Sequence, residues 1–408
     1  MFDFSELSAA WTSSLPLFGE TLAAWVDGLA INSVIVMIMM LFMLWGAIDK
    51  IMGNKFGYGE QFEEGLNCMG PLAISMAGVV AVAPILALVL NPIVGPIYNL
   101  VGADAAMFAT TLLACDMGGY PLAMQMAANE AIGNYAGLIL GSMMGPTIVF
   151  TIPVALGIID AEDRPYLGAG TLVGLVTIPV GCIAGGFVMN TTQYKLSVSE
   201  ILLNMIPVAL IALAIAAGLW FAPAAMMKGF DKFGTGVTIF ITAVTAIAIF
   251  EYNTGILFPL FNLMMDDGTG VNGLESGLLT CGIIAIVLAG AYPMVKFVTD
   301  KFGGALEKVG SALGMNAAGS AGMVATLANN IAMFNILKDM NPKGKVLNCA
   351  FAVSAAFVFG DHLGFCAGNN AEMIGPMIVG KLVAGILAVV LGNFMAPALI
   401  AKIPGAEK

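Results

Sequence analysis

Charge is scarce in this chain. Only 10% of its 408 residues are Asp, Glu, Lys or Arg, whereas about a quarter are charged in a typical soluble domain. Hydrophobic residues make up 59% of the sequence, and its mean hydropathy is +0.94. This composition excludes an ordinary soluble domain and predicts a membrane protein. The formal net charge of -11 says little about partners, because the topology of a membrane protein follows Lys and Arg rather than net charge, and we expect no nucleic-acid partner.

The residues that build disulfide, metal and nucleotide sites are also few. There is one histidine, and the six cysteines lie singly in or beside apolar segments without CxxC spacing. We therefore expect small buried thiols rather than disulfides, and neither a metal site nor a cofactor. No GxxxxGK[ST] loop occurs, so the sequence does not predict ATP hydrolysis.

Long apolar stretches are abundant. A helix needs about 20 apolar residues to cross about 30 Å of hydrocarbon. Nine stretches approach or meet this length, at residues 29–48, 70–91, 132–158, 167–189, 201–222, 235–250, 277–295, 346–366 and 382–400. They predict an all-α polytopic membrane protein with about nine spanning helices in a single transmembrane domain, residues 29–408.

Residues 1–28 differ from the rest of the chain. They lack the basic start and the small-residue cleavage site of a signal peptide. They also carry the bulky aromatic residues Trp11, Phe18 and Trp25. We therefore expect an N-terminal extension that lies as a helix at the membrane interface.

Two segments, 101–127 and 311–337, are only moderately apolar and rich in Gly and Ala, with "LACD" and "LANN" at their centres. Non-helical backbone at membrane depth is tolerated only where protein or water covers it. We therefore interpret both segments as re-entrant hairpins or broken helices. With the N-terminus outside, all basic residues except Lys195 and Lys381 then fall on the cytoplasmic side, together with the C-terminus, as the positive-inside rule requires.

The two halves of the chain show the same order of segments. Spans 29–48 and 70–91 recur after a shift of about 206 residues, and the first odd segment with the next two spans recurs after 214. Because an extra span, 201–222, joins the halves, repeat one (about 29–200) and repeat two (about 235–402) have opposite orientations. The alternative is a set of independent helices that happen to line up, since residue identity between the halves is near chance.

Asp116, in "TLLACDMGGY", is the first candidate binding residue. An uncompensated carboxylate in a bilayer costs several kcal/mol. We therefore expect Asp116 to face a polar cavity from which a cation pairs with it, with the hydroxyls of Thr111 and Tyr120 nearby. The alternative is that Asp116 caps a half-helix.

Asn329 and Asn330 take the matching place in the second half, and their amides suit a hydroxyl or carbonyl ligand. The alternative is that they bind backbone groups freed at the break. Pro146 and Thr147 break a span at the level of "FGDH", and the alternative there is a kink without a ligand.

Asp361 and His362, in "FGDHLGF", form the other polar pair in an apolar span. The acid is suited to hold an ammonium, and the imidazole is suited to relay a proton or to orient the acid. The alternative is a mutually satisfied Asp-His pair with no ligand.

Several motifs together indicate a family. They are "TLLACDMGGY", "LILGSMMGPTIVF", "IPVALGII", "IPVGCIAGG", "GAYPMV", "GMVATLANNI", "FAVSAAFVFGDHLGF" and "PMIVGKL". The sequence resembles the ethanolamine permeases of bacterial ethanolamine-utilisation systems from about Ile35 to Leu382. It departs from them in its N-terminal extension and in lacking their longer polar C-terminal tail. The resemblance implies ethanolamine uptake across the bacterial cytoplasmic (inner) membrane, and it supplies no ligand residues.

Ethanolamine pairs an amine that is protonated near neutral pH (pKa about 10) with a hydroxyl. Asp116 or Asp361 suits the ammonium, and aromatic faces add cation-π attraction. The candidates for the hydroxyl are Asn329, Asn330, Thr111 and Thr147, and the candidate aromatic residues are Tyr120, Phe108 and Phe365. Coupling to H+ or Na+, passive facilitation and a homo-oligomer are all compatible with the sequence.

Two other classes of protein compete with a transporter. An intramembrane aspartyl protease also has two acids in apolar segments, but such enzymes typically carry GxGD. Here Val358 replaces the first Gly, and Cys115 rather than Tyr precedes Asp116, so we predict no enzyme. A channel for small cations or amines differs from a transporter only in its gating, which the sequence does not distinguish.

Overall fold

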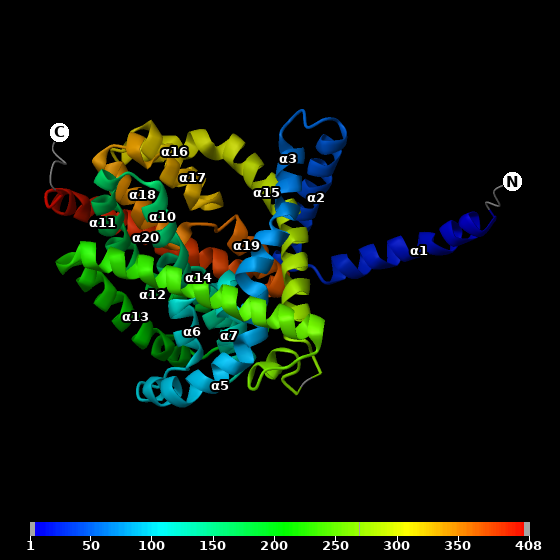
Figure 1. Cartoon of the computed structure of the whole chain (residues 1–408). Helices are drawn as coiled ribbons and strands as arrows, with labels where there is room; N and C mark the ends of the chain where they lie inside the picture. Colours follow the sequence, from blue (N-terminus) through cyan, green and yellow to red (C-terminus); the bar gives the residue numbers. More distant parts are fainter. Residues whose placement is uncertain (1–4, 269, 404–408) are drawn as a thin grey trace.

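The structure is a computed structural model that describes residues 5–268 and 270–403, and every regular element in these ranges is a helix (Figure 1). Helices satisfy their own backbone hydrogen bonds, which is what the bilayer demands of a spanning segment. In the first half the principal helices are α1 (Ser5–Asp27), α2 (Ile31–Ile51), α3 (Tyr58–Asn67), α4 (Met69–Leu72), α5 (Gly78–Asn99), α6 (Ala106–Leu112), α7 (Gly119–Met126), α8 (Glu130–Asn134), α9 (Met144–Pro146), α10 (Ile152–Ile158), α11 (Arg164–Leu175) and α12 (Ile178–Met189).

The remaining helices include the longest in the protein. They are α13 (Val198–Phe221), α14 (Pro223–Thr254), α15 (Gly273–Ala312), α16 (Ala317–Ala328), α17 (Asn330–Asn335), α18 (Pro342–Ala355), α19 (Asp361–Asn369) and α20 (Ile374–Ile400). Short 3-10 and π-helical pieces, among them η2 (Cys115–Met117), η3 (Tyr135–Ile139), η4 (Leu140–Ser142) and η5 (Thr147–Thr151), join or interrupt them.

Seven helical stretches within the described residues are long and apolar enough to cross a membrane. The pair formed by Ala161–Leu175 and Ile178–Met189, bent by 42°, makes an eighth if it is one span. These eight coincide with predicted spans. The span predicted at 346–366 is instead divided into α18 and α19 by non-helical backbone at residues 356–360.

The two odd segments are broken helices. In the first, α6 ends at Leu112 and is followed by the extended backbone of Leu113, and α7 begins after Gly118, which is in the left-handed conformation. In the second, α16 and α17 are separated by the extended backbone of Asn329. Extended residues interrupt the helical hydrogen-bond ladder, so both breaks leave backbone carbonyls and amides without helical partners.

A glycine from a neighbouring element presses on each of these breaks. A Cβ at Gly145 would lie 2.0 Å from the carbonyl oxygen of Leu113, and one at Gly360 would lie 2.1 Å from the carbonyl oxygen of Ala328. Only glycine allows the backbones to approach this closely. Gly360 follows Gly145 by 215 residues, and Ala328 follows Leu113 by the same number, which is one more than the shift predicted from the sequence.

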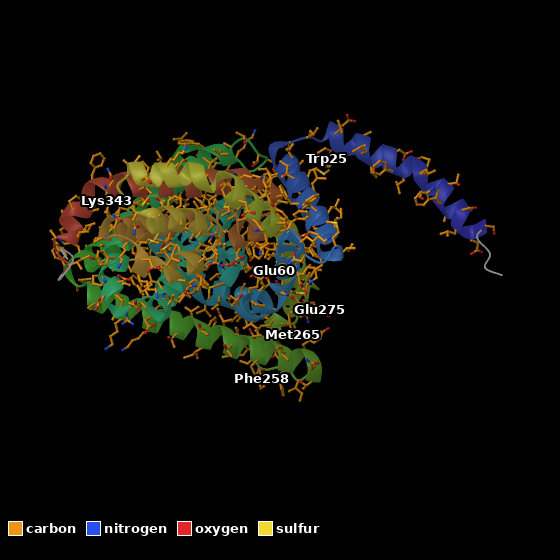
Figure 2. All side chains as sticks on the ribbon, turned by 90° about the horizontal axis from the view of Figure 1, so that it is seen from above. Trp25, Glu60, Phe258, Met265, Glu275 and Lys343 are labelled. Carbon is orange, nitrogen blue, oxygen red and sulfur yellow. The ribbon has the colours of Figure 1, made fainter. Side chains whose placement is uncertain are left out.

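The helices form a packed body from which α1 projects. Helices α11, α12, α18 and α20 pack against one another, and α15 packs along α2 and α3. Helix α1 extends away from the body and contains no buried residue (Figure 1), and Figure 2 shows Trp25 near its junction with the body. All six cysteines are free thiols and five of them are buried, as predicted.

Candidate functional site

A cavity of about 240 Å³ lies among the breaks and is the candidate site. Three ionisable side chains line it: Asp116 from η2, and Asp361 and His362 from the start of α19. The rest of the wall comes from α4, η1 (Ala73–Ala77), η5 and α15, with Cys68, Ser75, Phe150 and Phe357 among its residues. The sequence predicted that these three ionisable residues belong together, although they are far apart along the chain.

The Asp116 side chain is half-buried, and its carboxylate has no hydrogen bond to another residue in the described part of the chain. It does not cap a helix, because α7 begins after Gly118 and no side chain caps that end. The capping alternative is therefore not what the structure shows. A carboxylate without a protein partner in a mainly apolar wall is left with strong attraction for a cation in the cavity.

Asp361 is held more firmly. It is the first residue of α19, where the partial positive charge of the helix N-terminus favours an anion. The hydroxyl of Tyr292 on α15 donates a hydrogen bond to its Oδ1, and the Cys68 Sγ lies 3.3 Å from the same hydroxyl. Sequence reasoning missed Tyr292, although "GAYPMV" places its hydroxyl inside an apolar span.

His362 does not pair with Asp361. Its Nδ1 lies 2.9 Å from the Nζ of Lys381, which also donates to the backbone carbonyl of Ser142. An ammonium has only donors, so with Lys381 charged the Nδ1 is the acceptor and the proton of a neutral imidazole is on Nε2. The ring of Phe357 stands 5.2 Å from the imidazole.

The position of Lys381 differs from the one predicted from the sequence. We expected it on the outer surface, but it is only 1% exposed and lies inside α20. A buried lysine needs acceptors, and the structure supplies them through His362 and through Ser142, which ends the 3-10 piece η4 where the helix is interrupted. A charged residue within "PMIVGKL", amid an apolar span, was the signal that was available.

The centre of the site is compact. Ligand atoms of Cys115, Asp116 and His362 all lie within 4.8 Å of one another. These residue types are metal ligands, but the Lys381 ammonium beside the imidazole repels a multivalent cation. The arrangement therefore disfavours a multivalent metal ion.

Five of the eight predicted ligands do not line this cavity: the two threonines, the two asparagines and Tyr120. Thr111 donates to the carbonyl of Met107 at 2.6 Å, and Thr147 donates to the carbonyls of Met143 and Val353 at 2.8 and 3.0 Å. These are backbone contacts of the kind that short hydroxyls make in helices.

The two asparagines also bind protein groups. Asn329 accepts a hydrogen bond from the amide of Ile331 at 2.8 Å and so caps α17. Asn330 donates to the hydroxyl of Thr151 at 2.9 Å, while its Oδ1 is buried without a partner. Asn330 thus keeps an unused acceptor near η5.

Tyr120 lies at a second cavity, of about 370 Å³. Its hydroxyl donates to the Oδ1 of Asn134 at 3.4 Å, which also accepts from Asn370 at 3.1 Å. Its ring meets that of Phe365 edge to face, with 5.9 Å between centroids. Tyr120 therefore joins the first broken segment to α19 outside the charged cavity.

These features define a class: a multi-pass helical membrane protein with a charged cavity between discontinuous helices, an arrangement found in secondary transporters. Residues 31–395 match the family model of the ethanolamine utilisation protein EutH. The chain belongs to that family.

Curated relatives cover almost the whole chain. A probable ethanolamine permease EutH of Listeria monocytogenes is 52% identical over 375 residues, which are 92% of this chain and 96% of the relative. The protein of the same name from Escherichia coli K12 is 48% identical over 393 residues, which are 90% of this chain and 96% of the relative. The uncharacterized protein YxeR of Bacillus subtilis is 46% identical, over 92% and 97%. No solved structure matches the chain.

Proposed function

We propose that the protein carries ethanolamine across the bacterial cytoplasmic membrane, as a secondary transporter or a facilitator. The names of the Listeria and Escherichia relatives support this proposal. The observation that carries it is Asp116, a carboxylate that lines a cavity of about 240 Å³ in a membrane protein and has no hydrogen-bond partner among the described residues. A cation of the right size completes that site.

The charges of the centre favour one monovalent cation. In their ordinary charge states, Asp116 and Asp361 are two anions and Lys381 is one cation, so the centre has a net charge of minus one. Protonated ethanolamine carries the single positive charge that neutralises it. The cavity is also small enough to select a short molecule.

Of the two acids, Asp116 is the proposed partner of the ammonium. Asp361 already has the hydroxyl of Tyr292 and the N-terminus of α19 to stabilise its charge. The rings of Phe150 and Phe357 line the same cavity and add cation-π attraction.

Ser75 is the proposed partner of the substrate hydroxyl. Its side chain lines the cavity and donates to the carbonyl of Leu72 at 3.1 Å, which leaves its oxygen able to accept. Asn329, Asn330, Thr111 and Thr147 keep this role only if the broken segments move during transport.

Movement of the two halves provides access from either side. Each half contains a broken helix, and a glycine packs against each break at the same distance along the chain. This correspondence supports an inverted repeat that spans about 29–200 and 235–402. In this proposal the N-terminus is outside and the C-terminus is cytoplasmic. In this proposal α1 (Ser5–Asp27) lies at the membrane interface, outside the transport domain.

Ion coupling has two routes in this site. In the first, a proton passes between His362 and Lys381, which are hydrogen-bonded to each other, and Asp361 takes no part. A Na+ route uses carbonyls freed at the breaks. Passive movement down a gradient needs neither.

The test is uptake of labelled ethanolamine into proteoliposomes that contain the purified protein. The proposal predicts saturable uptake that empty liposomes lack. Accumulation above the outside concentration under an imposed H+ or Na+ gradient identifies a coupled transporter, and equilibration without accumulation identifies a facilitator. Uptake equal to that of empty liposomes under every gradient contradicts the proposal.

A further inference from the structure

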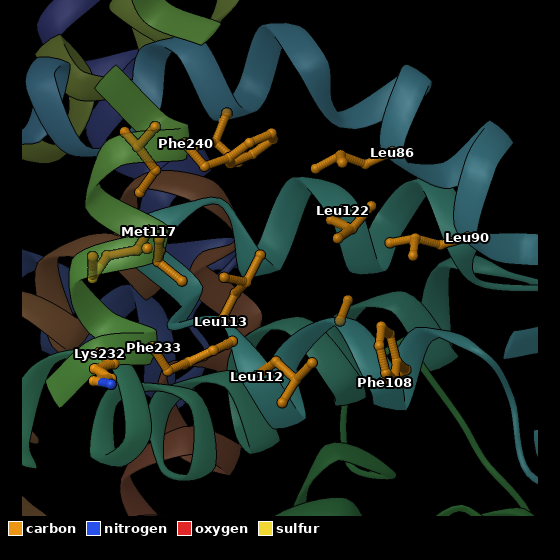
Figure 3. A pocket seen from close by; sticks show the side chains of 15 residues that line it. Leu86, Leu90, Phe108, Leu112, Leu113, Met117, Leu122, Lys232, Phe233 and Phe240 are labelled. Atoms are coloured by element: carbon orange, nitrogen blue, oxygen red, sulfur yellow. The ribbon is translucent and has the colours of Figure 1, made fainter. Parts of the chain in front are cut away.

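A groove of about 510 Å³ runs along α14 and the first broken segment (Figure 3). Apolar side chains of α5, α6, α7 and α14 form its walls. Lys232, at the left edge of Figure 3, is the one charged residue among the described residues that line it. It is exposed and forms no ion pair with another described residue.

The length of the groove matches one leaflet of a bilayer. Its α14 wall runs from Lys232 to Ile241, which at 1.5 Å per residue is roughly 13 Å of helix. Half of the hydrocarbon core is about 15 Å thick. Lys232 therefore stands at one end of an apolar groove about as long as one leaflet of hydrocarbon is thick.

The α14 wall of the groove has open space at Gly236. Gly236 lies between Phe233 and Phe240 on the α14 wall, and nothing stands within 4 Å of the position that its Cβ would take. An empty apolar hollow in a membrane-spanning wall is filled by lipid tails, since they surround every such wall and water has no hydrogen-bond partners there.

We propose that this groove is a binding site for an anionic phospholipid. One acyl chain lies over Gly236 between Phe233 and Phe240, and the phosphate pairs with the ammonium of Lys232. The cation demands an anion at the headgroup level, which distinguishes this site from a generic lipid-facing wall. The bulky phenylalanines disfavour a helix of a second copy, because helices in membranes associate through small residues.

The groove also touches the broken segment. Leu113 and Met117 line it, and Met117 lines the charged cavity as well. A bound acyl chain therefore packs against the residues on either side of the Ala114–Asp116 turn. This proposal concerns lipid binding and does not depend on which substrate the charged cavity takes.

The test uses the full-length protein in detergent and native mass spectrometry. It is titrated with phosphatidylglycerol or with phosphatidylcholine of the same acyl chains. We expect at least fivefold more retained phosphatidylglycerol than phosphatidylcholine. Lys232→Gln should remove this preference, and Lys228→Gln, which is on the same helix but lines a different cavity, should retain it.

A second pair of variants tests the acyl-chain site. Gly236→Leu should reduce binding of both lipids at least threefold, while Gly229→Leu, equally open but outside the groove, should not. Equal retention of the two lipids by the wild type, or equal effects within either pair of variants, overturns the proposal. A dimer lost only in Gly236→Leu assigns the groove to a second copy and also overturns it. Melting temperatures confirm that all variants are folded.

Discussion

Asp116 and Asp361, which line the cavity, and Lys381, which binds the lining residue His362, differ in how each charge is stabilised. Asp361 has a hydroxyl and a helix N-terminus, and Lys381 has an imidazole and a backbone carbonyl. Asp116 has neither. Since burying an unpaired charge costs several kcal/mol, the free energy of this site falls most when a cation joins Asp116. We therefore propose that Asp116 contributes most of the binding energy for a cationic substrate.

Lys381 sets the net charge of the site, and its replacement should change selectivity. Lys381→Gln leaves two acids without an internal cation, so a doubly protonated diamine becomes a better ligand. We expect ethylenediamine to inhibit ethanolamine uptake at about tenfold lower concentration than in the wild type, a difference of about 1.4 kcal/mol. The measurement is inhibition of labelled uptake in proteoliposomes.

Two variants control this experiment. Lys381→Arg keeps the charge and should keep the wild-type ratio of inhibition. Lys195→Gln removes an exposed lysine and should also leave the ratio unchanged. An unaltered ratio in Lys381→Gln, with normal protein in the membrane, would show that Lys381 does not set the charge of the site.

The sequence predicted the acids of the site but not its cation. Asp116 and Asp361 stand out because a carboxylate in an apolar run needs a reason to be there. Lys381 was assigned to the outer surface because the positive-inside rule treats lysines as loop residues, and only the tertiary structure reveals its partners. Thr111 and Thr147 bind backbone carbonyls, and a sequence does not show which way a hydroxyl turns.

At the scale of elements, the close approach of two interrupted segments shapes the site. Gly145 presses on the end of α6, and Gly360 presses on the end of α16. In the second half, the amides of Phe357 and Phe359 donate to the carbonyls of Thr326 and Leu327 at 3.1 and 3.0 Å. Carbonyls at the end of α16 thus accept hydrogen bonds from amides of the break between α18 and α19, which allows both interruptions to lie inside an apolar body.

Gly145→Ala tests this contact. The added methyl group would lie 2.0 Å from the Leu113 carbonyl oxygen, so the broken segment must move. We expect a loss of about 1–3 kcal/mol in stability, as for other overpacked sites, and a fall in uptake. Thermal unfolding in detergent measures the first effect and proteoliposome uptake the second.

Gly157→Ala is the matched control, because nothing lies within 4 Å of its Cβ position. It should unfold at or slightly above the wild-type temperature, as alanine is the better helix former. Equal melting temperatures for the two variants would mean that the break tolerates displacement.

Hydropathy was sufficient for the continuous helices and for the two broken segments. Apolar length alone predicts a span, so eight coincide with the structure. The division of 346–366 was missed because "FAVSAAFVFG" is apolar throughout. Its interruption comes from Phe357, whose φ of 62° lies in the left-handed region, and from the contact of Gly360 with α16, neither of which hydropathy records.

For the whole molecule, the inverted repeat makes a topological prediction. It places the loop after the first broken segment outside and the loop after the second one in the cytoplasm. Glu130→Cys, at the start of α8, and Lys338→Cys, in a 3-10 turn, put thiols at exposed positions just after the two broken segments. An impermeant thiol reagent added to intact cells should label the first variant at once and the second only after the cells are opened.

The background for this labelling is Cys68→Ser, since the other five native thiols are buried. Labelling of both new thiols in intact cells, or of neither, would place the two loops on the same side and contradict the inverted repeat. Neither outcome bears on the binding residues, so topology and site are tested separately.

The central claim is that Asp116 holds the ammonium of ethanolamine. Equilibrium binding of labelled ethanolamine to purified wild type and Asp116→Asn tests it most directly, with Glu60→Gln as a surface-acid control. The account predicts saturable binding that Asp116→Asn weakens at least about a hundredfold, or roughly 2.8 kcal/mol, and that Glu60→Gln leaves intact. Equal affinity in a folded Asp116→Asn protein would contradict it.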